Sequence, residues 1–329
     1  TSAQLPQPVQ SRTDTPIVNL YSLNTALPCW SLIPAGAAAA SSSVRINPFK
    51  SGPVPEGREV LWNRHGRILA QRPVFTLDPS FHGGAYYVQD SSSMFVGHVF
   101  RQLVKPVIAD SGNAGPVRVL DLCAAPGGKT TDLAVSLREM LGDRFVLVSN
   151  EVMKQRASVL ADNVALWGDP NVVVTSDDPR AFAGLTEFFD IIIADVPCSG
   201  EGMFRKDEEA QRQWSPDNVS HCQARQRRIV ADVWPSLKSG GIFIYSTCTF
   251  NRFENDGNVS WMLDSLGAEP LLDNDVITER DGVLKTEFGY SLVPGFVEGE
   301  GQYCSAVRKV GEYADIRSIQ SARQGKPAV

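Results

Sequence analysis

Two cysteines stand at positions where their thiols could act on a substrate. Cys198 lies in the segment DVPCSGEG and Cys248 in YSTCTF, and each follows an apolar run typical of a central strand. A thiolate can add to an electron-poor ring carbon and make the neighbouring carbon nucleophilic. Addition to C6 of a cytosine would activate C5 toward a methyl donor, after which a base removes the C5 proton and the thiol leaves. One thiol would attack and the other would help to resolve the adduct, although a lone cysteine is more often a small buried apolar residue.

Two charged residues belong to the same hypothesis. Asp195 comes three residues before Cys198 and could hydrogen-bond a base near its N3 and N4 atoms. Lys129 opens a predicted helix and could orient Asp195 or lower a thiol pKa. Simpler interpretations remain, namely a strand-end cap for Asp195 and a surface charge for Lys129.

A loop of small residues marks a candidate cofactor site. Residues Val119–Thr131 read VLDLCAAPGGKTT, which predicts a strand, a tight turn and a helix N-terminus. Glycines let a backbone approach a ligand closely, and the free N–H groups of a helix start favour anionic groups. The loop has neither the Walker pattern nor the G-x-G-x-x-G pattern, and a Gly-Gly turn also fits an ordinary strand-to-helix connection. Glu151, directly after the predicted strand Phe145–Asn150, suits a ribose diol.

Strands and helices alternate after the first third of the chain, which predicts an α/β fold with a mostly parallel sheet covered on both faces. We expect strands near 118–123, 145–150, 171–176, 189–196 and 241–247, helices near 128–140, 153–166, 219–238 and 254–266, and a last strand at Cys304–Lys309 near the sheet edge. Parallel strands bring their carboxyl ends to one rim, so Cys198 and Cys248 are expected to converge across fifty intervening residues.

The predicted domains follow from changes in composition. Residues 1–43 are rich in Ser, Ala and Pro and are expected to form a poorly ordered tail or a short helix. Residues 44–108 form a small α+β unit, 109–312 the catalytic domain and 313–329 a tail or linker. Within the small unit we expect strands at 44–47, 59–62 and 68–70, a polar turn at 63–67, a loop at 79–94 and a helix near 91–104, followed by a linker at 109–115. Its basic residues suit RNA contact, or a solvated surface: Arg45, Lys50, Arg64, Arg67, Arg72 and Lys105. Tyr86 and Tyr87 could stack on bases, but adjacent tyrosines in a loop are more often packing residues.

Composition limits the other possibilities. The net charge of −6 argues mildly against broad electrostatic binding of nucleic acid but leaves room for a local basic patch. The six cysteines form no C-x-x-C pair and no metal-ligand spacing, so we expect no metal, no disulfide framework and a cytoplasmic location. No apolar run is long enough to span a bilayer and no signal peptide opens the chain, so no membrane partner is expected.

These motifs resemble those of the NOL1/NOP2/sun family of S-adenosylmethionine-dependent RNA cytosine-5 methyltransferases, in the branch similar to the bacterial rRNA small-subunit methyltransferase F. The resemblance covers roughly 44–309 and rests on LDLCAAPGGKTT, NEVMKQRASVLADN, DVPCSGEGMFRKD and YSTCTFNRFEN. It implies a class I, Rossmann-like methyltransferase sheet of seven strands, preceded by an RNA-recognition-like α+β unit. It also implies S-adenosyl-L-methionine contacts at Cys123, Ala124, Ala125, Pro126, Gly127, Gly128, Lys129, Glu151, Arg156, Asp178 and Asp195.

The resemblance further assigns the attack to Cys248 and product release to Cys198, with Asp195 and Lys129 assisting. It implies cytosine C5 methylation in RNA, with 16S rRNA favoured, by a protein expected to be a monomer. The open alternatives are tRNA as the substrate and an RNA-binding assembly factor without catalysis. Amine methylation is disfavoured because PCSG stands at the place where amine methyltransferases carry a loop of the type N/D-P-P-Y/F. Two departures from the family are Pro294-Gly295 in place of Pro-His, and a chain that stops soon after the last predicted strand, so that we expect a C-terminal RNA-binding domain to be missing.

Overall fold

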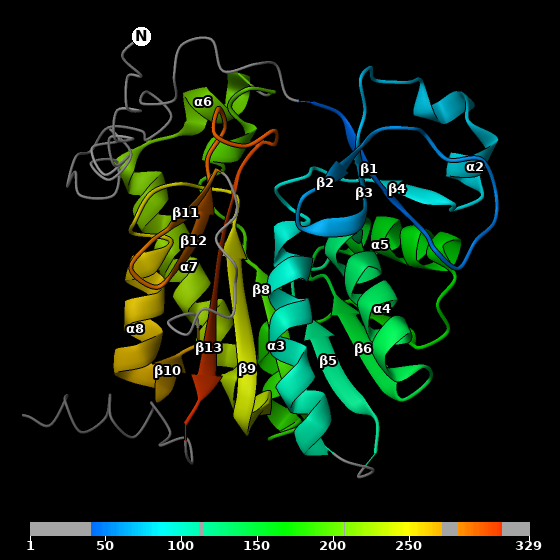
Figure 1. Cartoon of the computed structure of the whole chain (residues 1–329). Helices are drawn as coiled ribbons and strands as arrows, with labels where there is room; N and C mark the ends of the chain where they lie inside the picture. Colours follow the sequence, from blue (N-terminus) through cyan, green and yellow to red (C-terminus); the bar gives the residue numbers. More distant parts are fainter. Residues whose placement is uncertain (1–40, 112–114, 207, 272–281, 311–329) are drawn as a thin grey trace, which may run out of the picture.

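The computed structural model describes residues 41–111, 115–206, 208–271 and 282–310. Nearly all of the expected N-terminal tail and the whole of the expected tail at 313–329 lie outside the described residues. The described part forms two β-sheets with helices packed around the larger one (Figure 1).

The larger sheet contains the predicted alternation of strands and helices. Its strands are β5 (Val117–Asp121), β6 (Phe145–Asn150), β7 (Val172–Thr175), β8 (Phe189–Asp195), β9 (Leu237–Thr247), β10 (Ala268–Pro270), β11 (Val283–Lys285), β12 (Gly289–Leu292) and β13 (Gln302–Lys309). The strand order is β11-β12-β13-β9-β8-β5-β6-β7, with β10 beside β13. The five strands from β9 to β7 are parallel, as predicted, and the other four are antiparallel.

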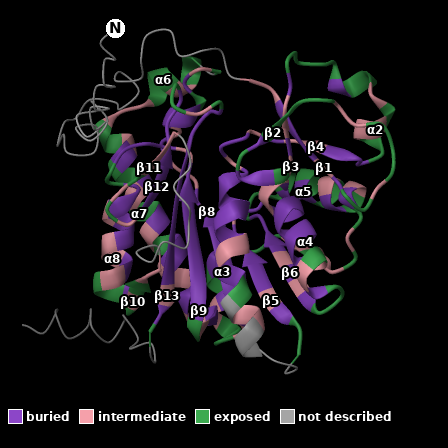
Figure 2. Cartoon of the chain, in the orientation of Figure 1, coloured by how far each residue is buried: buried purple, intermediate pink, exposed green. Residues whose placement is uncertain are grey.

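Helices cover both faces of this sheet. The helices of the described chain are α2 (Pro79–His82), α3 (Phe95–Ser111), α4 (Gly128–Leu141), α5 (Lys154–Trp167), α6 (Glu208–Gln213), α7 (Pro216–Val233) and α8 (Asp256–Leu266). Ile191 and Ile193 pack with α3 and α4, whereas Ile192 packs with α7 and α8. The central strands are therefore buried on both faces, as Figure 2 shows in purple, and this is why they read as continuous apolar runs.

The sheet has nine described strands where seven were expected. Strand β13 was expected near the edge, but it lies inside the sheet between β9 and β12. The additional strands β10, β11 and β12 have three, three and four residues. Strands this short carry almost no periodicity, so tertiary pairing rather than local sequence determines them.

A small antiparallel sheet lies beyond the carboxyl ends of β5 and β6 (Figure 1). Its order is β2-β3-β1-β4, with β1 at Ser43–Ile46, β2 at Arg58–Val60, β3 at Asn63–Ile68 and β4 at Tyr86–Val88. The predicted turn at 63–67 is wrong, because these residues form most of β3. The predicted loop at 79–94 is also wrong in part, because it contains α2 and β4. Gly66 explains the first error: a Cβ there would lie 2.7 Å from Val60 Cγ2, so glycine occupies a place where the strand pattern leads one to expect an apolar side chain.

Helix α3 connects the two sheets. It begins at Phe95 and runs to Ser111, so the predicted linker at 109–115 is helical over its first three residues. Phe95, Val99 and Leu103 belong to the same apolar cluster as strands β5 and β8 of the larger sheet. The helix thus packs on the larger sheet although it follows directly on the small one. No helix among the described residues is long and apolar enough to cross a membrane.

Candidate active site

The two predicted cysteines meet at the rim of the larger sheet. Their sulfur atoms, Cys198 Sγ and Cys248 Sγ, lie 3.2 Å apart, and both thiols are free. Strands β8 and β9 are parallel neighbours with Asp195 paired to Ser246, so the segments that follow them emerge side by side. The expectation that parallel topology brings these residues together is confirmed.

The surroundings of Cys198 disfavour its thiolate. The hydrogen bond with Cys248, together with burial, raises the pKa of Cys198 well above that of an ordinary thiol. Either sulfur could donate in the hydrogen bond between them. The thiolate is the nucleophilic form of a cysteine, so the raised pKa makes Cys198 a poor nucleophile. Both side chains are half-buried, so a ligand at the rim can reach them.

Asp195 is held by three side chains from separate parts of the chain. Its Oδ2 accepts from Lys129 Nζ at 2.7 Å, and its Oδ1 accepts from Ser246 Oγ at 2.7 Å and Gln302 Nε2 at 2.9 Å. Burial works against ionisation of Asp195, but the Lys129 charge and these hydrogen bonds outweigh it and lower its pKa. Lys129 also donates to Ser93 Oγ at 2.9 Å, and its pKa is raised because Asp195 outweighs the effect of burial.

The loop between β5 and α4 has the form that the sequence predicted. The Ala125–Pro126 peptide is cis, and Gly127 has a φ of 111°, a conformation that favours glycine. Helix α4 begins at Gly128, the next residue. Asp121, at the end of β5, is wholly buried and accepts from Thr130 Oγ1 at 2.7 Å. Burial raises the pKa of its carboxyl to about 7.

Other predicted cofactor residues lie around this loop. Glu151 is buried at the end of β6, and its Oε1 accepts from the backbone N–H of Met153 at 3.0 Å. Its Oε2 lies 3.2 Å from Arg156 Nη1 but receives no hydrogen bond within the described chain. Arg156 also donates to the carbonyl oxygen of Ala125 at 2.8 Å. A buried carboxylate oxygen in need of a donor fits the predicted hydroxyl ligand.

Two further predicted cofactor residues have other surroundings. Asp178 follows β7 and accepts from the backbone and side chain of Arg180. Cys123 lies in the cofactor loop, and burial raises the pKa of its thiol, which keeps it protonated and unreactive. The described residues contain no cluster of three or more His, Cys, Asp or Glu that could hold a metal ion.

Two buried glutamates brace the cysteine segments, and the sequence reasoning missed them. Glu254, which follows Cys248, accepts from the backbone N–H of Ser199 at 3.0 Å, next to Cys198. Glu201, which follows Cys198, accepts from the backbone N–H groups of Phe250 and Asn251 at 2.7 and 3.0 Å. The segment after Cys248 thus supplies a carboxylate that holds the segment of Cys198, and the segment after Cys198 supplies one that holds the segment of Cys248. The only sequence signal was that both glutamates stand within the two cysteine motifs.

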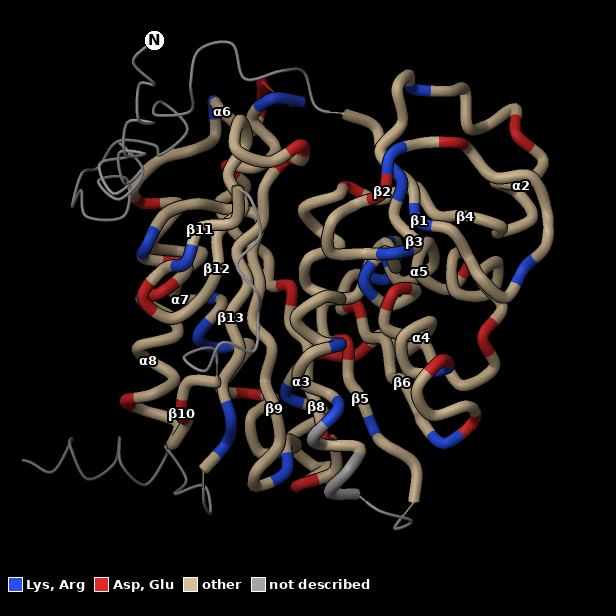
Figure 3. The backbone as a smooth tube through the Cα atoms, in the orientation of Figure 1, with Lys and Arg blue, Asp and Glu red and all other residues tan. Residues whose placement is uncertain are grey.

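Arg45, Tyr86 and two basic residues after Cys198 all contact other parts of the protein. Arg45 is wholly buried, so the expectation that it contacts RNA is wrong. Tyr86 is also buried, in an apolar cluster, with its hydroxyl donating to Asp78 at 2.6 Å; it is a packing residue. Arg205 and Lys206, in the segment after Cys198, form ion pairs with Glu300 at 3.1 and 2.9 Å. Figure 3 shows basic and acidic positions interleaved over the small sheet.

Comparison with known proteins gives consistent matches. The sequence profile of a family described as "16S rRNA methyltransferase RsmB/F" matches residues 113–308. The ribosomal RNA small subunit methyltransferase F of Salmonella agona is 36% identical over 230 residues, which are 69% of this chain and 45% of that protein. The protein of the same name from Salmonella arizonae is 35% identical over the same shares. The chain therefore spans about half the length of the curated relatives it matches.

Two solved structures from Pyrococcus horikoshii share the fold. A methyltransferase homolog protein superposes with a TM-score of 0.66 at 25% identity, covering 83% of this chain and 88% of that one. NSun6 with SFG superposes with a TM-score of 0.60 at 24% identity, covering 73% of this chain and 57% of that one. The Rossmann-like methyltransferase fold preceded by a small antiparallel sheet is confirmed.

Proposed function

Because the chain belongs to the RsmB/F family of 16S rRNA methyltransferases, we propose that it transfers a methyl group from S-adenosylmethionine to C5 of a cytosine in small-subunit rRNA. The observation that carries the proposal is the pair of free thiols 3.2 Å apart at the rim where the cofactor loop ends. Methylation of an amine or a hydroxyl needs no thiol nucleophile. Methylation at C5 of cytosine needs one, because C5 becomes nucleophilic once a thiolate has added at C6, and a second thiol beside the first can assist release of the product.

The residues of the rim fit S-adenosylmethionine. Glu151 would take the ribose hydroxyls on its buried Oε2, which receives no hydrogen bond within the described chain. The turn at Gly127–Gly128 would let the cofactor approach the backbone. The other proposed contacts are the loop residues from Cys123 to Lys129, with Arg156, Asp178 and Asp195. When bound, S-adenosylmethionine supplies an electrophilic methyl group.

In the proposed reaction, the thiolate of Cys248 adds to C6 of the cytosine, and the electron pair moves toward C5. Asp195, which Lys129 keeps ionised, accepts a hydrogen bond from the N4 amino group and so orients the base. After methylation the C5 proton is lost to a base, the bond between Cys248 Sγ and C6 breaks, and the ring regains its double bond. Cys198, adjacent and able to exchange a proton with Cys248, assists this release.

A trapping experiment tests both cysteine roles. Cys198→Ala protein is incubated with S-adenosylmethionine and small-subunit rRNA and run on a denaturing gel. We expect a denaturant-stable protein–RNA band that Cys248→Ala in the same protein abolishes. Cys222→Ala serves as the matched control, because Cys222 is buried on α7 outside the thiol pair and should behave as wild type. A band from Cys248→Ala alone would reverse the roles. Methyl transfer by wild type with no band from either variant would contradict covalent catalysis.

The choice of RNA is tested in the same assay. Naked 16S rRNA, assembled small subunits and tRNA are offered in parallel, and we expect labelling of the small-subunit RNA. Preferred labelling of tRNA would support the alternative substrate. RNA binding without methyl transfer to any of the three would support an assembly factor, although RNA binding alone does not require the paired thiols or the Lys129–Asp195 contact.

A further inference from the structure

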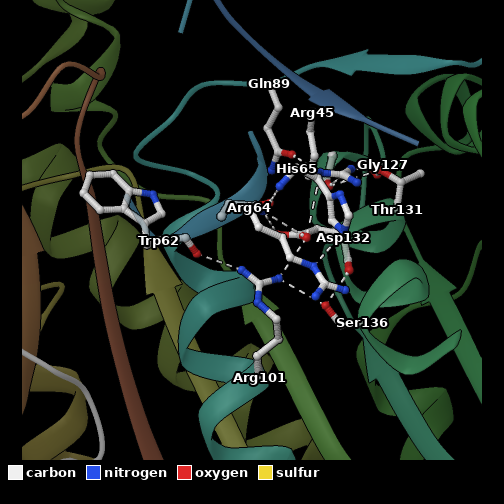
Figure 4. A network of polar contacts seen from close by, with 12 residues as sticks. Arg45, Trp62, Arg64, His65, Gln89, Arg101, Gly127, Thr131, Asp132 and Ser136 are labelled. Carbon is white, nitrogen blue, oxygen red and sulfur yellow. Dashed lines mark hydrogen bonds and ion pairs between the residues drawn. The ribbon is translucent and has the colours of Figure 1, made fainter. Parts of the chain in front are cut away.

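A buried arginine of the small sheet reaches the cofactor loop. Arg45 lies on β1 and has no exposed surface. Its guanidinium donates from Nη2 to the carbonyl oxygen of Gly128 at 3.0 Å. The same nitrogen donates to the hydroxyl of Thr131 (Figure 4). Its Nε donates to Gln89 Oε1 at 2.9 Å, within the small unit. One side chain therefore connects the small sheet to the first turn of α4.

The position is costly for a cation, and its neighbours offset that cost. The N-terminal end of a helix carries partial positive charge, so a guanidinium at the first turn of α4 is unfavourable by itself. Asp132, on the same helix and 2% exposed, has its Oδ1 3.9 Å from Arg45 Nε. The indole ring of Trp167 lies 4.7 Å from the guanidinium carbon. Burial lowers the pKa of Arg45 to about 10, so it remains charged at neutral pH.

Neighbouring residues of the small unit contact the same loop. Tyr87 donates from its hydroxyl to the carbonyl oxygen of Pro126 at 3.1 Å. Ser93 accepts from Lys129 at 2.9 Å. A Cβ added at Gly128 would lie 3.4 Å from both Tyr87 and Gln89, so this unit also packs on the glycine turn. The small unit thus holds the carbonyl side of the loop.

We propose that Arg45 is a positioning residue for the cofactor loop, which fixes the Gly127–Gly128 turn so that the affinity for S-adenosylmethionine depends on the small sheet. The inference rests on the proposed function, since it assumes that this turn binds that cofactor. A guanidinium that bonds a backbone carbonyl and a side chain one turn later sets both the place and the direction of the helix start. A cofactor that contacts this turn is therefore affected by losing Arg45.

Arg101 provides a matched control from the same network. It lies on α3 and donates to Asp132 Oδ1 at 3.0 Å, as Figure 4 shows. Its other partners are Ser136 Oγ at 3.1 Å and the carbonyl oxygen of Trp62 at 3.0 Å, neither of which belongs to the cofactor loop. Replacement of Arg101 and replacement of Arg45 each remove a cation that lies beside Asp132. Replacement of Arg101, however, leaves the contacts between Arg45 and the cofactor loop intact.

The test measures binding of S-adenosylhomocysteine by titration calorimetry, beside thermal unfolding of each variant. We expect Arg45→Met to raise the Kd about tenfold, which is the effect of about one charge-assisted hydrogen bond. Arg101→Met should keep the Kd within about twofold of wild type while lowering the unfolding temperature. Arg45→Lys retains the charge and one donor group, so its Kd should lie between those of wild type and Arg45→Met. Thr131→Val, which removes one of the two loop contacts, should raise the Kd about threefold.

The outcomes separate this inference from the proposed function. Wild-type protein that fails to bind S-adenosylhomocysteine overturns both. Wild-type binding with an unchanged Kd in folded Arg45→Met, or with Arg101→Met as weak as Arg45→Met, overturns the inference alone. If Arg45→Met does not fold, the binding measurements on Arg45→Lys and Thr131→Val test the inference in its place. A Kd for S-adenosylhomocysteine that is unchanged in both variants rejects a positioning role for Arg45.

Discussion

Replacing Glu254 by alanine removes a buried carboxylate that holds the peptide next to Cys198. Its Oε2 accepts from the backbone N–H of Ser199 at 3.0 Å and from Gln226 Nε2 at 2.7 Å, and its Oε1 accepts from Asn251 Nδ2 at 2.8 Å. The side chain has no exposed surface. Alanine would leave these donors without their acceptor, whereas glutamine would keep an acceptor for two of them and place its amide against the amide of Asn251.

The cost follows from counting these bonds. Each buried hydrogen bond contributes about 1 kcal/mol net, so alanine should lower the free energy of unfolding by about 3 kcal/mol. Burial raises the pKa of Glu254 despite its hydrogen bonds, which offsets the extra strength of a charged acceptor, and the value for neutral groups therefore applies. Glutamine should cost about 1 kcal/mol, because one donor loses its acceptor.

Urea unfolding of wild type, Glu254→Gln and Glu254→Ala measures both values. In the trapping assay, Glu254→Ala should release product more slowly and accumulate more protein–RNA adduct, because the backbone N–H of Ser199, next to Cys198, loses its acceptor. Glu201→Ala should instead slow adduct formation, because Glu201 holds the backbone that follows Cys248. The reasoning is refuted if alanine at position 254 costs no more than glutamine, or if both alanine variants impair the same step.

Three further predictions follow from charges and backbone geometry. In Lys129→Met, Asp195 loses the cation that lowers its pKa, so the acidic limb of the pH–rate profile should move to higher pH; an unchanged limb would contradict the ion-pair role. Burial raises the pKa of Asp121 to about 7, so its contribution to stability is complete below its unfolded value of about 4 and is lost as pH rises through 7. The melting temperature of wild type should therefore fall over that interval, and Asp121→Asn should reduce the fall. Gly127→Ala should cost about 1–2 kcal/mol and weaken S-adenosylhomocysteine binding, because its φ is 111° and a Cβ would lie 3.2 Å from Leu160 Cδ1; equal binding would count against a close approach at this turn.

The thiol pair could be predicted because it depends on topology alone. Apolar runs identify parallel strands, parallel strands share a rim, and residues just past two neighbouring strands must then meet. Cys198 and Cys248 satisfy each step, as do Asp195 and the loop before Lys129. The roles of the two cysteines came from the family resemblance, since spacing cannot show which thiol loses its proton.

The missed features depend on burial of polar side chains, which sequence patterns do not report. Arg45 reads as one basic residue among several, but the structure encloses it completely. Glu201 and Glu254 carry no sequence signal of burial, yet both side chains are buried in a hydrogen-bonded network. Strand β3 was missed because Gly66 replaces an inward side chain where Val60 and Met94 fill the space. In each case the structure is determined by a contact with a residue distant in sequence, or by neighbouring side chains that lie too close to the backbone to leave room for another.

The placement of β13 has a consequence for synthesis of the protein. This strand covers the whole carboxyl half of β9, and it supplies Gln302 to Asp195. While the ribosome has not yet released residues 302–309, β9 is an unpaired apolar edge able to pair with other chains. The nascent protein therefore completes its rim and covers this exposed strand edge in one step, when β13 pairs with β9. A product that ends before β13 should both lack the Gln302 contact and aggregate.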